Sequence, residues 1–548
     1  MAANYDVLLI HPPAFYDFRK KPFFTGALGT SIEQVQFNKV PIGMMSIAEY
    51  LDRHGYKVIV DNLCDRMVSS QTFDPEQHLK NISAQVFAIG LHFQQHSQGA
   101  MEIARLCKQF HPGSLVVMGG LTATRFHEEI IRKYDYVDAV IRGETEKPFL
   151  EFVRALEKEG RISGTPNLTY RTESGEIKST SLMAPSVNLD EFEYTRLDLL
   201  DPQSSIFAPG LIPRWSLEVC RGCVYNCAIC GGSAYTYKNY LGMKRPAFRS
   251  PHKIVNDIKK LSEQGVRSIG IYQDPRMGGK KYCQELMTAL RNEKPNVSRL
   301  SLDLLVPAGE EFIKAVNDID RPVTIHVCPD TGSDEVRRLF GRRYSTEELI
   351  KSVKLCHKYL IPVTSFFSVG LAGETPKKVE ETWKLWDTLS SLENIMTTRS
   401  DSLGIGQQVS MGGPIMGPIV IDPGSLAFDF PEKYGYKLLY KNLEEYIRGL
   451  SMPSWHQWLN YETDLLNKEA LIEIILQSVA FTIDQREAYG FYDSSQAFTE
   501  RLKLRADIIA VNEVNRIMKL EDAAEQESSL RSLRNRIDSF LNSGQRFR

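Results

Sequence analysis

Short apolar segments alternate with segments of helical periodicity over residues 1–160. Apolar runs at 6–10, 58–60, 86–91, 115–118 and 137–141 have the length and composition of strands, and apolar residues recur at helical spacing over 44–51, 100–110 and 127–133. Strand, helix, strand in this rhythm is typical of a parallel sheet covered on both faces. We therefore predict an α/β fold in which residues 1–160 form a Rossmann-like domain.

Ligands of such sheets bind at the carboxyl ends of the strands. In this sequence those ends are followed by small, polar or turn-forming residues rather than by another apolar run. The segments concerned are His11-Pro12-Pro13, His92 to Ser97, Gly119-Gly120 and Gly143-Glu144. We expect them to share one edge of the sheet and to form a binding site there.

A second strand–helix series begins at Trp215. Strands are predicted at 215–219, 267–272, 299–304, 323–328 and 362–369, with helices such as 251–264 and 346–359 between them. Units of about 30 to 40 residues indicate a partial TIM-type (β/α) barrel over 213–405. Residues 161–212, broken by glycine and proline, are predicted to be a linker with a small hairpin at 167–180. Residues 406–548 begin with a loop containing Gly412, Gly413 and Pro414 and continue as a mostly helical domain, predicted to cap the barrel and help define the substrate.

Four of the nine cysteines crowd into residues 220–230. Cys223, Cys227 and Cys230 are spaced C-x3-C-x2-C, so their thiolates can bind three irons of a 4Fe–4S cluster and leave the fourth iron open. A disulfide framework would spread its cysteines along the chain. The alternative is a zinc site with Cys220 as fourth ligand, but zinc ribbons usually pair two distant C-x2-C knuckles and no second knuckle is present.

This cysteine spacing, after the first strand of a (β/α) barrel, resembles the radical S-adenosylmethionine (SAM) superfamily. The resemblance implies that the open iron is chelated by the amino and carboxylate groups of SAM. An electron from the cluster then cleaves the sulfonium to give a 5′-deoxyadenosyl radical. The residue before the last cysteine is usually aromatic in that family, whereas this chain has Ile229.

Two later segments resemble SAM-contacting segments of the same family. The run Gly370-Leu371-Ala372-Gly373-Glu374-Thr375 is similar to G-L-P-G-E-T, and the run from Pro329 to Val336 is similar to the E-S-G-S segment after the fourth strand. The glycine-rich acidic segment often seen after the second strand is replaced by Tyr272-Gln273-Asp274. By resemblance Asp330 would contact the SAM amino group or ribose, and one of Arg337, Arg338, Arg342 and Arg343 would pair with its carboxylate. The full set of SAM contacts that we predict is Tyr225, Gly232, Gln273, Asp330, Ser333, Gly370, Leu371 and Gly373.

The N-terminal domain resembles the cobalamin-binding domain that is fused to many radical SAM enzymes. The matching features are Pro12-Pro13, a helix opened by Pro41-Ile42-Gly43-Met44, Gly119-Gly120 and Gly143-Glu144-Thr145-Glu146. The alternative is a nucleotide-binding or degenerate Rossmann domain, but no G-x-G-x-x-G follows a strand. The resemblance predicts cobalamin contacts from Pro12, Pro13, His92, Ser97, Gly119, Gly120, Gly143 and Glu144.

The Asp-x-His-x-x-Gly segment that supplies an axial histidine in methionine-synthase-like domains is not present in the first loop. We therefore expect no protein histidine to replace the lower base of cobalamin. A weakly ligated or open lower face favours methyl transfer. His11, His92 and His96 are the nearby imidazoles, and we expect each to be a hydrogen-bonding residue rather than a cobalt ligand.

These resemblances predict a cobalamin-dependent radical SAM C-methyltransferase acting on an unactivated sp3 carbon, through methylcobalamin and a 5′-deoxyadenosyl radical. A protein or peptide side chain ranks ahead of a small metabolite or lipid as substrate, since archaeal members methylate glutamine or arginine of methyl-coenzyme M reductase. One alternative is a cobalamin-dependent radical SAM cyclase or ring-rearranging enzyme acting on a small molecule or lipid. Another is a cobalamin-binding sensor or carrier with an inert cluster. No catalytic side chain is assigned.

Charge and hydropathy limit the expected partners. Lys plus Arg is 66 and Asp plus Glu is 68, so the formal net charge of −2 gives no overall attraction to nucleic acid or anionic membrane. No apolar run approaches the roughly 18 residues of a membrane span, and the N-terminus lacks a basic signal region. We expect a cytoplasmic protein without nucleic-acid or membrane partners. By its chemistry it would need SAM and a reducing donor of flavodoxin or ferredoxin type.

Overall fold

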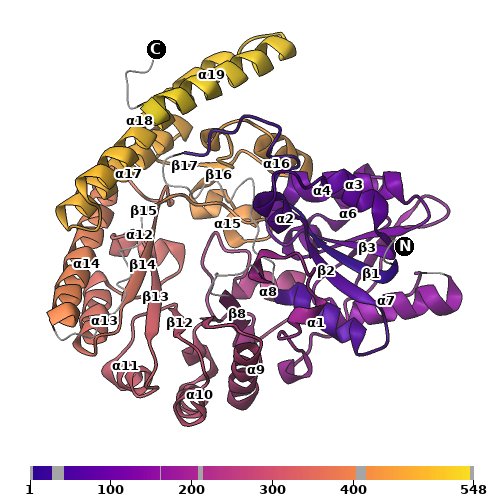
Figure 1. Ribbon diagram of the computed structural model, residues 1–548, viewed down its shortest axis with the longest axis horizontal. Helices are drawn as coiled ribbons and strands as arrows, with labels where there is room; N and C mark the ends of the chain where they lie inside the picture. The colour runs from indigo at the N-terminus through magenta and orange to yellow at the C-terminus, as the bar shows by residue number, and fades with distance from the viewer. Residues whose placement is uncertain (1–3, 27–41, 161, 208–213, 403–414, 544–548) are drawn as a thin grey trace.

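The computed structural model describes residues 4–26, 42–160, 162–207, 214–402 and 415–543. Pro41, Gly412, Gly413 and Pro414 lie outside these described residues. Figure 1 shows two sheets, one in the N-terminal part of the chain and one in the middle, with long helices of the C-terminal part along one side. The fold class is the predicted one, an α/β chain with a helical C-terminus.

The N-terminal sheet has seven strands in the order β2-β1-β3-β4-β5-β6-β7. Neighbouring strands from β2 to β5 are parallel, whereas β5 pairs with β6 and β6 with β7 in antiparallel fashion. The strands β6 and β7 form the hairpin predicted within the linker, and they extend this sheet. The bounds are β1 Asn4–His11, β2 Val58–Asn62, β3 Ser83–Gly90, β4 Leu115–Gly119, β5 Ala139–Ile141, β6 Leu168–Arg171 and β7 Ile177–Ser179.

Helices cover both faces of this sheet, as the Rossmann-like prediction requires. α1 packs against α7, and α4 packs against α3 (Figure 1). The order β2-β1-β3 places a topological switch point between β1 and β3, where doubly wound sheets bind their ligands. The bounds are α1 Ile42–Asp52, α2 Leu63–Ser69, α3 Pro75–Asn81, α4 Ser97–Phe110, α5 Leu121–Arg125, α6 His127–Lys133 and α7 Glu146–Glu159.

The central sheet is a six-stranded parallel sheet in the order β15-β14-β13-β12-β11-β8, which confirms the partial barrel. Five strands match the predicted ones, and β15 is additional. The strands are β8 Arg214–Glu218, β11 Ser268–Tyr272, β12 Arg299–Leu304, β13 Val323–Asp330, β14 Val363–Val369 and β15 Ile415–Pro418. The intervening elements are β9 Cys220–Arg221, α8 Ala234–Tyr240, β10 Ala247–Phe248, α9 Pro251–Glu263, α10 Lys280–Glu293, α11 Glu310–Asn317, α12 Asp334–Phe340, α13 Thr346–Lys358 and α14 Pro376–Ser402.

Local sequence sets where the barrel helices begin and end. α9 begins with Ser250, whose side chain accepts from the Lys253 backbone, followed by proline at the first helical position. α13 begins with a reciprocal capping box between Ser345 and Glu348. Along β13 and β14, buried residues alternate with half-buried ones. This alternation packs one face of each strand against helices and leaves the other face toward the barrel interior.

The C-terminal part of the chain contacts both sheets' domains. α16 packs against α4 of the N-terminal domain, and α17 packs against α14 of the barrel. The N-terminal segment also reaches it, because Phe24 and Trp455 exchange a backbone hydrogen bond from Trp455 N to Phe24 O of 3.0 Å. The elements are α15 Leu426–Asp429, β16 Tyr436–Leu438, α16 Leu443–Leu450, β17 Tyr461–Thr463, α17 Lys468–Ala488, α18 Ser494–Ile517 and α19 Ala523–Ser543. None of the helices in the described ranges combines the length and apolarity that crossing a bilayer requires.

Candidate functional site

The three predicted cluster ligands lie on one loop between β9 and α8. Cys223, Cys227 and Cys230 are each half-buried. The backbone nitrogen of Tyr225 donates to Cys223 Sγ at 3.4 Å, and that of Gly232 donates to Cys230 Sγ at 3.3 Å. Hydrogen bonds of this kind favour the thiolate, whereas burial raises the pKa of the Cys223 and Cys227 thiols. Tyr225 and Gly232, both predicted SAM contacts, are thus part of this loop.

Cys220 differs from these three residues. It is 1% exposed, and its Sγ lies 3.6 Å from the carbonyl oxygen of Gly222. Among the described residues, no group of three His, Cys, Asp or Glu side chains is arranged to hold a single metal ion. A 4Fe–4S cluster bonds each thiolate to a different iron, so its ligands need not converge on one point. Three half-buried thiols on an eight-residue loop fit that donor set.

Two distant segments hold the cysteine loop in place. The backbone nitrogen of Ala228 donates to Phe340 O at 2.8 Å, and a Cβ at Gly341 would lie 2.5 Å from the carbonyl oxygen of Asn226. On the other side, the Asp422 carboxylate accepts from the backbone nitrogen of Gly231 at 2.8 Å. Sequence analysis gave Asp422 no role. An Asp-Pro-Gly-Ser turn was visible, but nothing in it indicated a contact with the cysteines.

The predicted SAM contacts on β13 and α12 lie beside this loop. Asp330 is the last residue of β13 and has a left-handed φ of 63°. The Arg342 Nε lies 2.9 Å from Asp330 Oδ2, and the charge of Arg342 also acts on the Cys227 thiol. Ser333, which precedes α12, is buried. Of the four candidate arginines, Arg342 therefore faces the cysteines.

Arg337 has a different role. Its side chain is fully buried, and its guanidinium pairs with Asp334 at 2.7 Å and donates to the backbone around β13. It holds the turn between β13 and α12 together. Gln273, at the end of β11, has a left-handed φ of 72°, and the neighbouring Asp274 is buried in an ion pair with Arg276 at 2.6 Å. Asp274 is therefore used within the turn.

In the predicted SAM segment after β14, the carboxylate of Glu374 holds the turn by accepting hydrogen bonds from its backbone. Glu374 accepts from the backbone nitrogens of Gly370 at 2.8 Å and Leu371 at 3.0 Å, and burial raises its pKa to about 7. A Cβ at Gly370 would lie 2.5 Å from the hydroxyl oxygen of Tyr461, so β17 of the C-terminal part rests on this turn. Gly373 has a left-handed φ of 84°. Gly370 has a left-handed φ of 92°, so glycine is required there by both packing and conformation.

The inner face of the barrel carries a polar pair that sequence analysis missed. His326 on β13 and Asp303 on β12 approach to 3.1 Å, and the His326 ring lies 5.8 Å from the ring of Phe366 on β14. His326 precedes Asp330 by four residues on β13, and the register of β13 against β14 shifts between Val327 and Asp330. The alternation Thr324, His326, Cys328, Asp330 was the available signal, since polar residues at a period of two mark one face of a strand.

The predicted cobalamin residues follow the carboxyl ends of neighbouring strands in the N-terminal sheet. Pro12 and Pro13 follow β1 and are buried, and a Cβ at Gly99 of α4 would lie 1.9 Å from the carbonyl oxygen of Pro13. His92 lies between β3 and α4, and Ser97 is the first residue of α4. Burial lowers the pKa of His92 to about 4, so this imidazole is neutral near pH 7. His11 and His96 pack edge to face with ring centroids 4.9 Å apart.

The same edge holds buried amide atoms that suit a polar ligand. Gln94 Nε2 and Gln95 Oε1 are buried, and neither has a hydrogen-bond partner among the described residues. Such atoms are costly unless a ligand or water satisfies them. The propionamide and acetamide arms of a corrin are complementary donors and acceptors, so this edge fits cobalamin. Gly120, however, is required by the protein itself: its φ is 111°, and a Cβ would lie 2.6 Å from Cα of His92.

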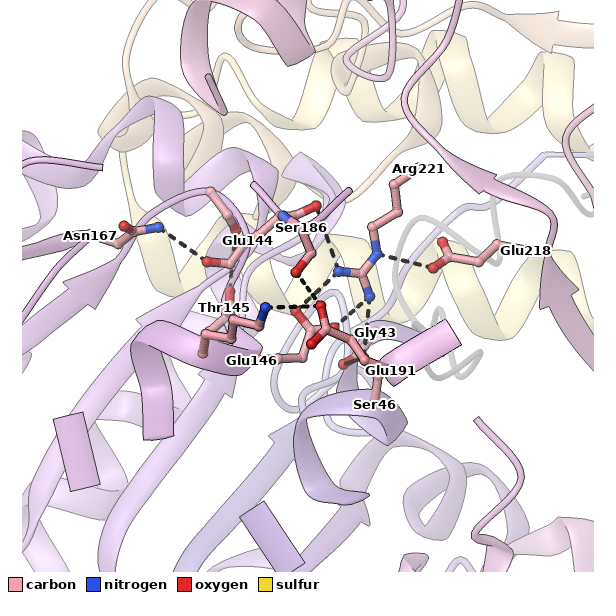
Figure 2. A network of polar contacts seen from close by, with 12 residues as sticks. Gly43, Ser46, Glu144, Thr145, Glu146, Asn167, Ser186, Glu191, Glu218 and Arg221 are labelled. Atoms are coloured by element: carbon pink, nitrogen blue, oxygen red, sulfur yellow. Dashed lines mark hydrogen bonds and ion pairs between the residues drawn. The ribbon is translucent and has the colours of Figure 1, made fainter. Parts of the chain in front are cut away.

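Glu144 faces the barrel rather than the strand edge. Its carboxylate accepts from the backbone nitrogen of Ser186 at 2.8 Å and lies 3.8 Å from the Arg221 guanidinium. Figure 2 shows Glu144, Glu146 and Glu218 gathered around Arg221. Gly143, with a φ of 72°, forms the turn that precedes Glu144 and Glu146. The structure thus places Glu144 in a contact between domains, which the sequence resemblance did not predict.

Known protein-family models match both the N-terminal domain and the barrel. The radical SAM superfamily model matches residues 217–385, and the B12 binding domain model matches residues 31–153. The chain belongs to the radical SAM proteins that carry a B12-binding domain. The cofactors of this radical SAM enzyme are accordingly a 4Fe–4S cluster, SAM and cobalamin, as the sequence predicted.

Curated relatives of this chain carry names that describe different reactions. An uncharacterized methyltransferase of Pyrococcus horikoshii is 26% identical over 63% of this chain and 72% of its own length. The anaerobic magnesium-protoporphyrin IX monomethyl ester cyclase of Rubrivivax gelatinosus is 23% identical over 64% of this chain, which spans less than two thirds (62%) of the cyclase.

Solved structures show the same fold. The radical SAM methyltransferase TsrM from Kitasatospora setae, with tryptophan substrate and a SAM analogue bound, aligns with a TM-score of 0.57 and 16% identity over 86% of this chain and 88% of TsrM. The cobalamin-dependent radical SAM enzyme OxsB aligns with a TM-score of 0.59 and 13% identity over 99% of this chain and 81% of OxsB. At these identities the likeness concerns the fold.

Proposed function

We propose that this radical SAM enzyme is a C-methyltransferase that methylates an unactivated sp3 carbon. The observation that carries the proposal is the ion pair between Arg221, two residues before Cys223, and Glu146 at the carboxyl edge of the N-terminal sheet. A cluster on the cysteine loop and a cobalamin at that edge would then lie in neighbouring sites. A methyltransferase relative and a methyltransferase of the same fold support this reaction.

We assign Cys223, Cys227 and Cys230 as the cluster ligands. Arg342 suits the SAM carboxylate, because a guanidinium binds a carboxylate through two parallel hydrogen bonds. Its release from Asp330 would free that carboxylate for the SAM amino group. The backbone of Gly370, Leu371 and Gly373 would lie against the adenosine, with Tyr225, Gly232, Gln273 and Ser333 completing the predicted set.

For cobalamin we assign the edge formed by Pro12, Pro13, Gly119 and Gly120, together with His92 and Ser97. Gln94 and Gln95 join this set because their buried amide atoms need partners. Gly143 shapes the turn beside the corrin. Glu144 is assigned to the contact with Arg221 instead.

When bound, the cluster with SAM supplies an adenosyl radical and cobalamin supplies a transferable methyl group. The protein's own work is positional. The barrel must hold the substrate carbon within reach of both groups, and small displacements at that distance cost large factors in rate. We expect the C-terminal part, whose α16 packs against α4 and whose Tyr461 in β17 lies against Gly370, to limit the access of water to the site.

For the substrate we favour a protein or peptide side chain, such as glutamine or arginine of methyl-coenzyme M reductase. The amino acid substrate of TsrM supports a side chain of this kind. The Asp303–His326 pair on the inner face of the barrel suits a polar group of the substrate. The second candidate is a cyclase or ring-rearranging reaction on a small molecule or lipid, which the cyclase relative favours.

The test is anaerobic reconstitution with iron, sulfide, hydroxocobalamin and a reductant, followed by mass spectrometry with methyl-labelled SAM. The proposal expects bound corrin, 5′-deoxyadenosine, and label on a peptide in an extract offered as substrate. Corrin that never acquires labelled methyl would contradict methyl transfer. SAM cleavage with an unlabelled but altered product would favour the cyclase, and absence of SAM cleavage would favour a carrier with an inert cluster.

A further inference from the structure

Arg221 joins the cysteine loop to the N-terminal domain through a buried network. Its NH1 lies 3.1 Å from Glu146 Oε2, and its NH2 contacts the other oxygen of the same carboxylate, so the pair is bidentate. Its Nε donates to Glu218 of β8 at 3.0 Å. Figure 2 shows these carboxylates approaching one guanidinium from two sides. Only 11% of the Arg221 side chain is exposed.

The surroundings leave this guanidinium a single orientation. NH2 also lies 3.0 Å from the Tyr194 hydroxyl, and the guanidinium lies 4.9 Å from the centre of the Phe192 ring. Every nitrogen of Arg221 is engaged, and its plane is held against an aromatic face. A lysine would keep the charge but lose the two parallel bonds and the stacking.

The chain segments next to Arg221 and Glu146 lead directly to the two assigned cofactor sites. Arg221 lies in β9, which pairs with β10 through Ala247 and leads directly to Cys223. Glu146 begins α7, immediately after the turn at Gly143 on the carboxyl edge of the N-terminal sheet. A displacement of Arg221 or Glu146 would therefore shift the cysteine loop relative to the edge of the N-terminal sheet that we assign to cobalamin.

We propose that Arg221 is a positioning residue which, through Glu146 and Glu144, sets the separation and orientation of the cluster relative to cobalamin. The inference rests on the proposed function, since it assumes that both cofactors occupy the sites assigned above. On this view the Glu144 and Glu146 carboxylates of the N-terminal domain help to position the cysteine loop of the barrel by contacting Arg221. Loosening the pair should leave each cofactor bound but spoil their mutual geometry.

The experiment compares wild type with Arg221→Lys and Glu146→Gln in the full chain, reconstituted with the cluster and cobalamin. A reduced 4Fe–4S cluster and cob(II)alamin each have a net spin of one half, so the dipolar splitting of their electron paramagnetic resonance signals reports their separation. Asp257→Asn is the control, because Asp257 forms a buried pair with Arg249 that lies within the barrel and does not join the two domains. Iron content, corrin content and melting temperature are measured for every protein.

The inference expects near wild-type cofactor content in both variants, with an altered or broadened splitting and unchanged splitting in Asp257→Asn. Methyl transfer per SAM cleaved should fall by about 100-fold, the cost of a displacement near 1 Å. Loss of the cluster alone in Glu146→Gln would overturn it, because Glu146 would then be needed to retain the cluster rather than to set its distance from cobalamin. An unchanged splitting in both variants, or the loss of both cofactors, would overturn it. Failure of wild type to bind corrin or cleave SAM would instead reject the proposed function.

Discussion

Asp422 accepts a hydrogen bond from the backbone nitrogen of Gly231, the residue after Cys230, across 191 positions of sequence. The backbone of Asp422 in turn donates to the carbonyl oxygen of Ile229 at 3.1 Å, and Ala427 donates to Ala228 at 2.8 Å. The C-terminal part of the chain therefore holds the last third of the cysteine loop directly.

Replacing Asp422 by alanine should loosen this loop and weaken cluster retention. The lost acceptor leaves the Gly231 nitrogen unpaired, at a cost of about 1–3 kcal/mol. We expect iron content after reconstitution to fall several-fold while corrin content stays unchanged, measured on the same preparation. Asp422→Asn keeps an acceptor oxygen and should retain most of the iron. Equal iron in the alanine variant and wild type would contradict the role given to this contact.

Alanine at Cys223, Cys227 or Cys230 should abolish formation of 5′-deoxyadenosine and spare corrin binding, because the two cofactors occupy different domains. Iron analysis and product chromatography check this. Cys220→Ala is the control, since Cys220 is buried and its Sγ contacts the Gly222 carbonyl oxygen. If Cys220→Ala lost the metal as fully as the other three, a four-thiolate site would be the better description.

The order of strands and helices was predictable because apolar periodicity is local. Contacts between distant segments were not: Asp422 is separated from Gly231 by most of the barrel, and no local signal connects them. Glu144 shows the same limit. Its motif correctly marked the carboxyl edge of the N-terminal sheet, but whether a carboxylate faces a ligand or Arg221 depends on how two domains pack. The strand β15 follows a glycine-rich stretch without strand periodicity, so pairing with β14 rather than local propensity determines it.

Two adjacent glycines provide a sharp test of the cobalamin edge. A methyl group at Gly120 would lie 2.6 Å from backbone atoms of His92, at a φ of 111°, whereas one at Gly119 would lie 3.6 Å from the Ile141 carbonyl oxygen. Gly120→Ala should therefore displace the loop after β3, at a cost of roughly 1–3 kcal/mol, and lower corrin retention after gel filtration. Gly119→Ala should retain corrin. The reverse order of effects would show that the corrin, not His92, is what requires a small residue here.

Glu374 should make stability depend on pH. Burial raises its pKa to about 7 from an ordinary value of 4.5, so the folded state binds the proton more tightly than the unfolded state. The stabilising contribution of the protonated carboxyl is complete below pH 4.5 and is lost as the pH rises toward 7, by about 3 kcal/mol. Glu374→Gln should remove this loss, so the difference in melting temperature between wild type and variant should change over pH 4.5–7. A constant difference across that window would contradict the buried, protonated state.

Two histidine–carboxylate pairs, one on strands β12 and β13 and the other between helices α13 and α14, should behave differently. His326 and Asp303 lie 3.1 Å apart on the inner face, with part of each side chain exposed, whereas His357 and Glu393 lie 2.7 Å apart and almost fully buried on the outer, helix-covered side. If the inner pair binds a polar group of the substrate, His326→Asn should lower label transfer to a peptide extract by about tenfold with little change in melting temperature. His357→Asn should lower the melting temperature by several degrees, as expected for breaking a buried pair, with transfer per folded molecule retained. Equal transfer in His326→Asn and wild type would remove the inner pair from the substrate site.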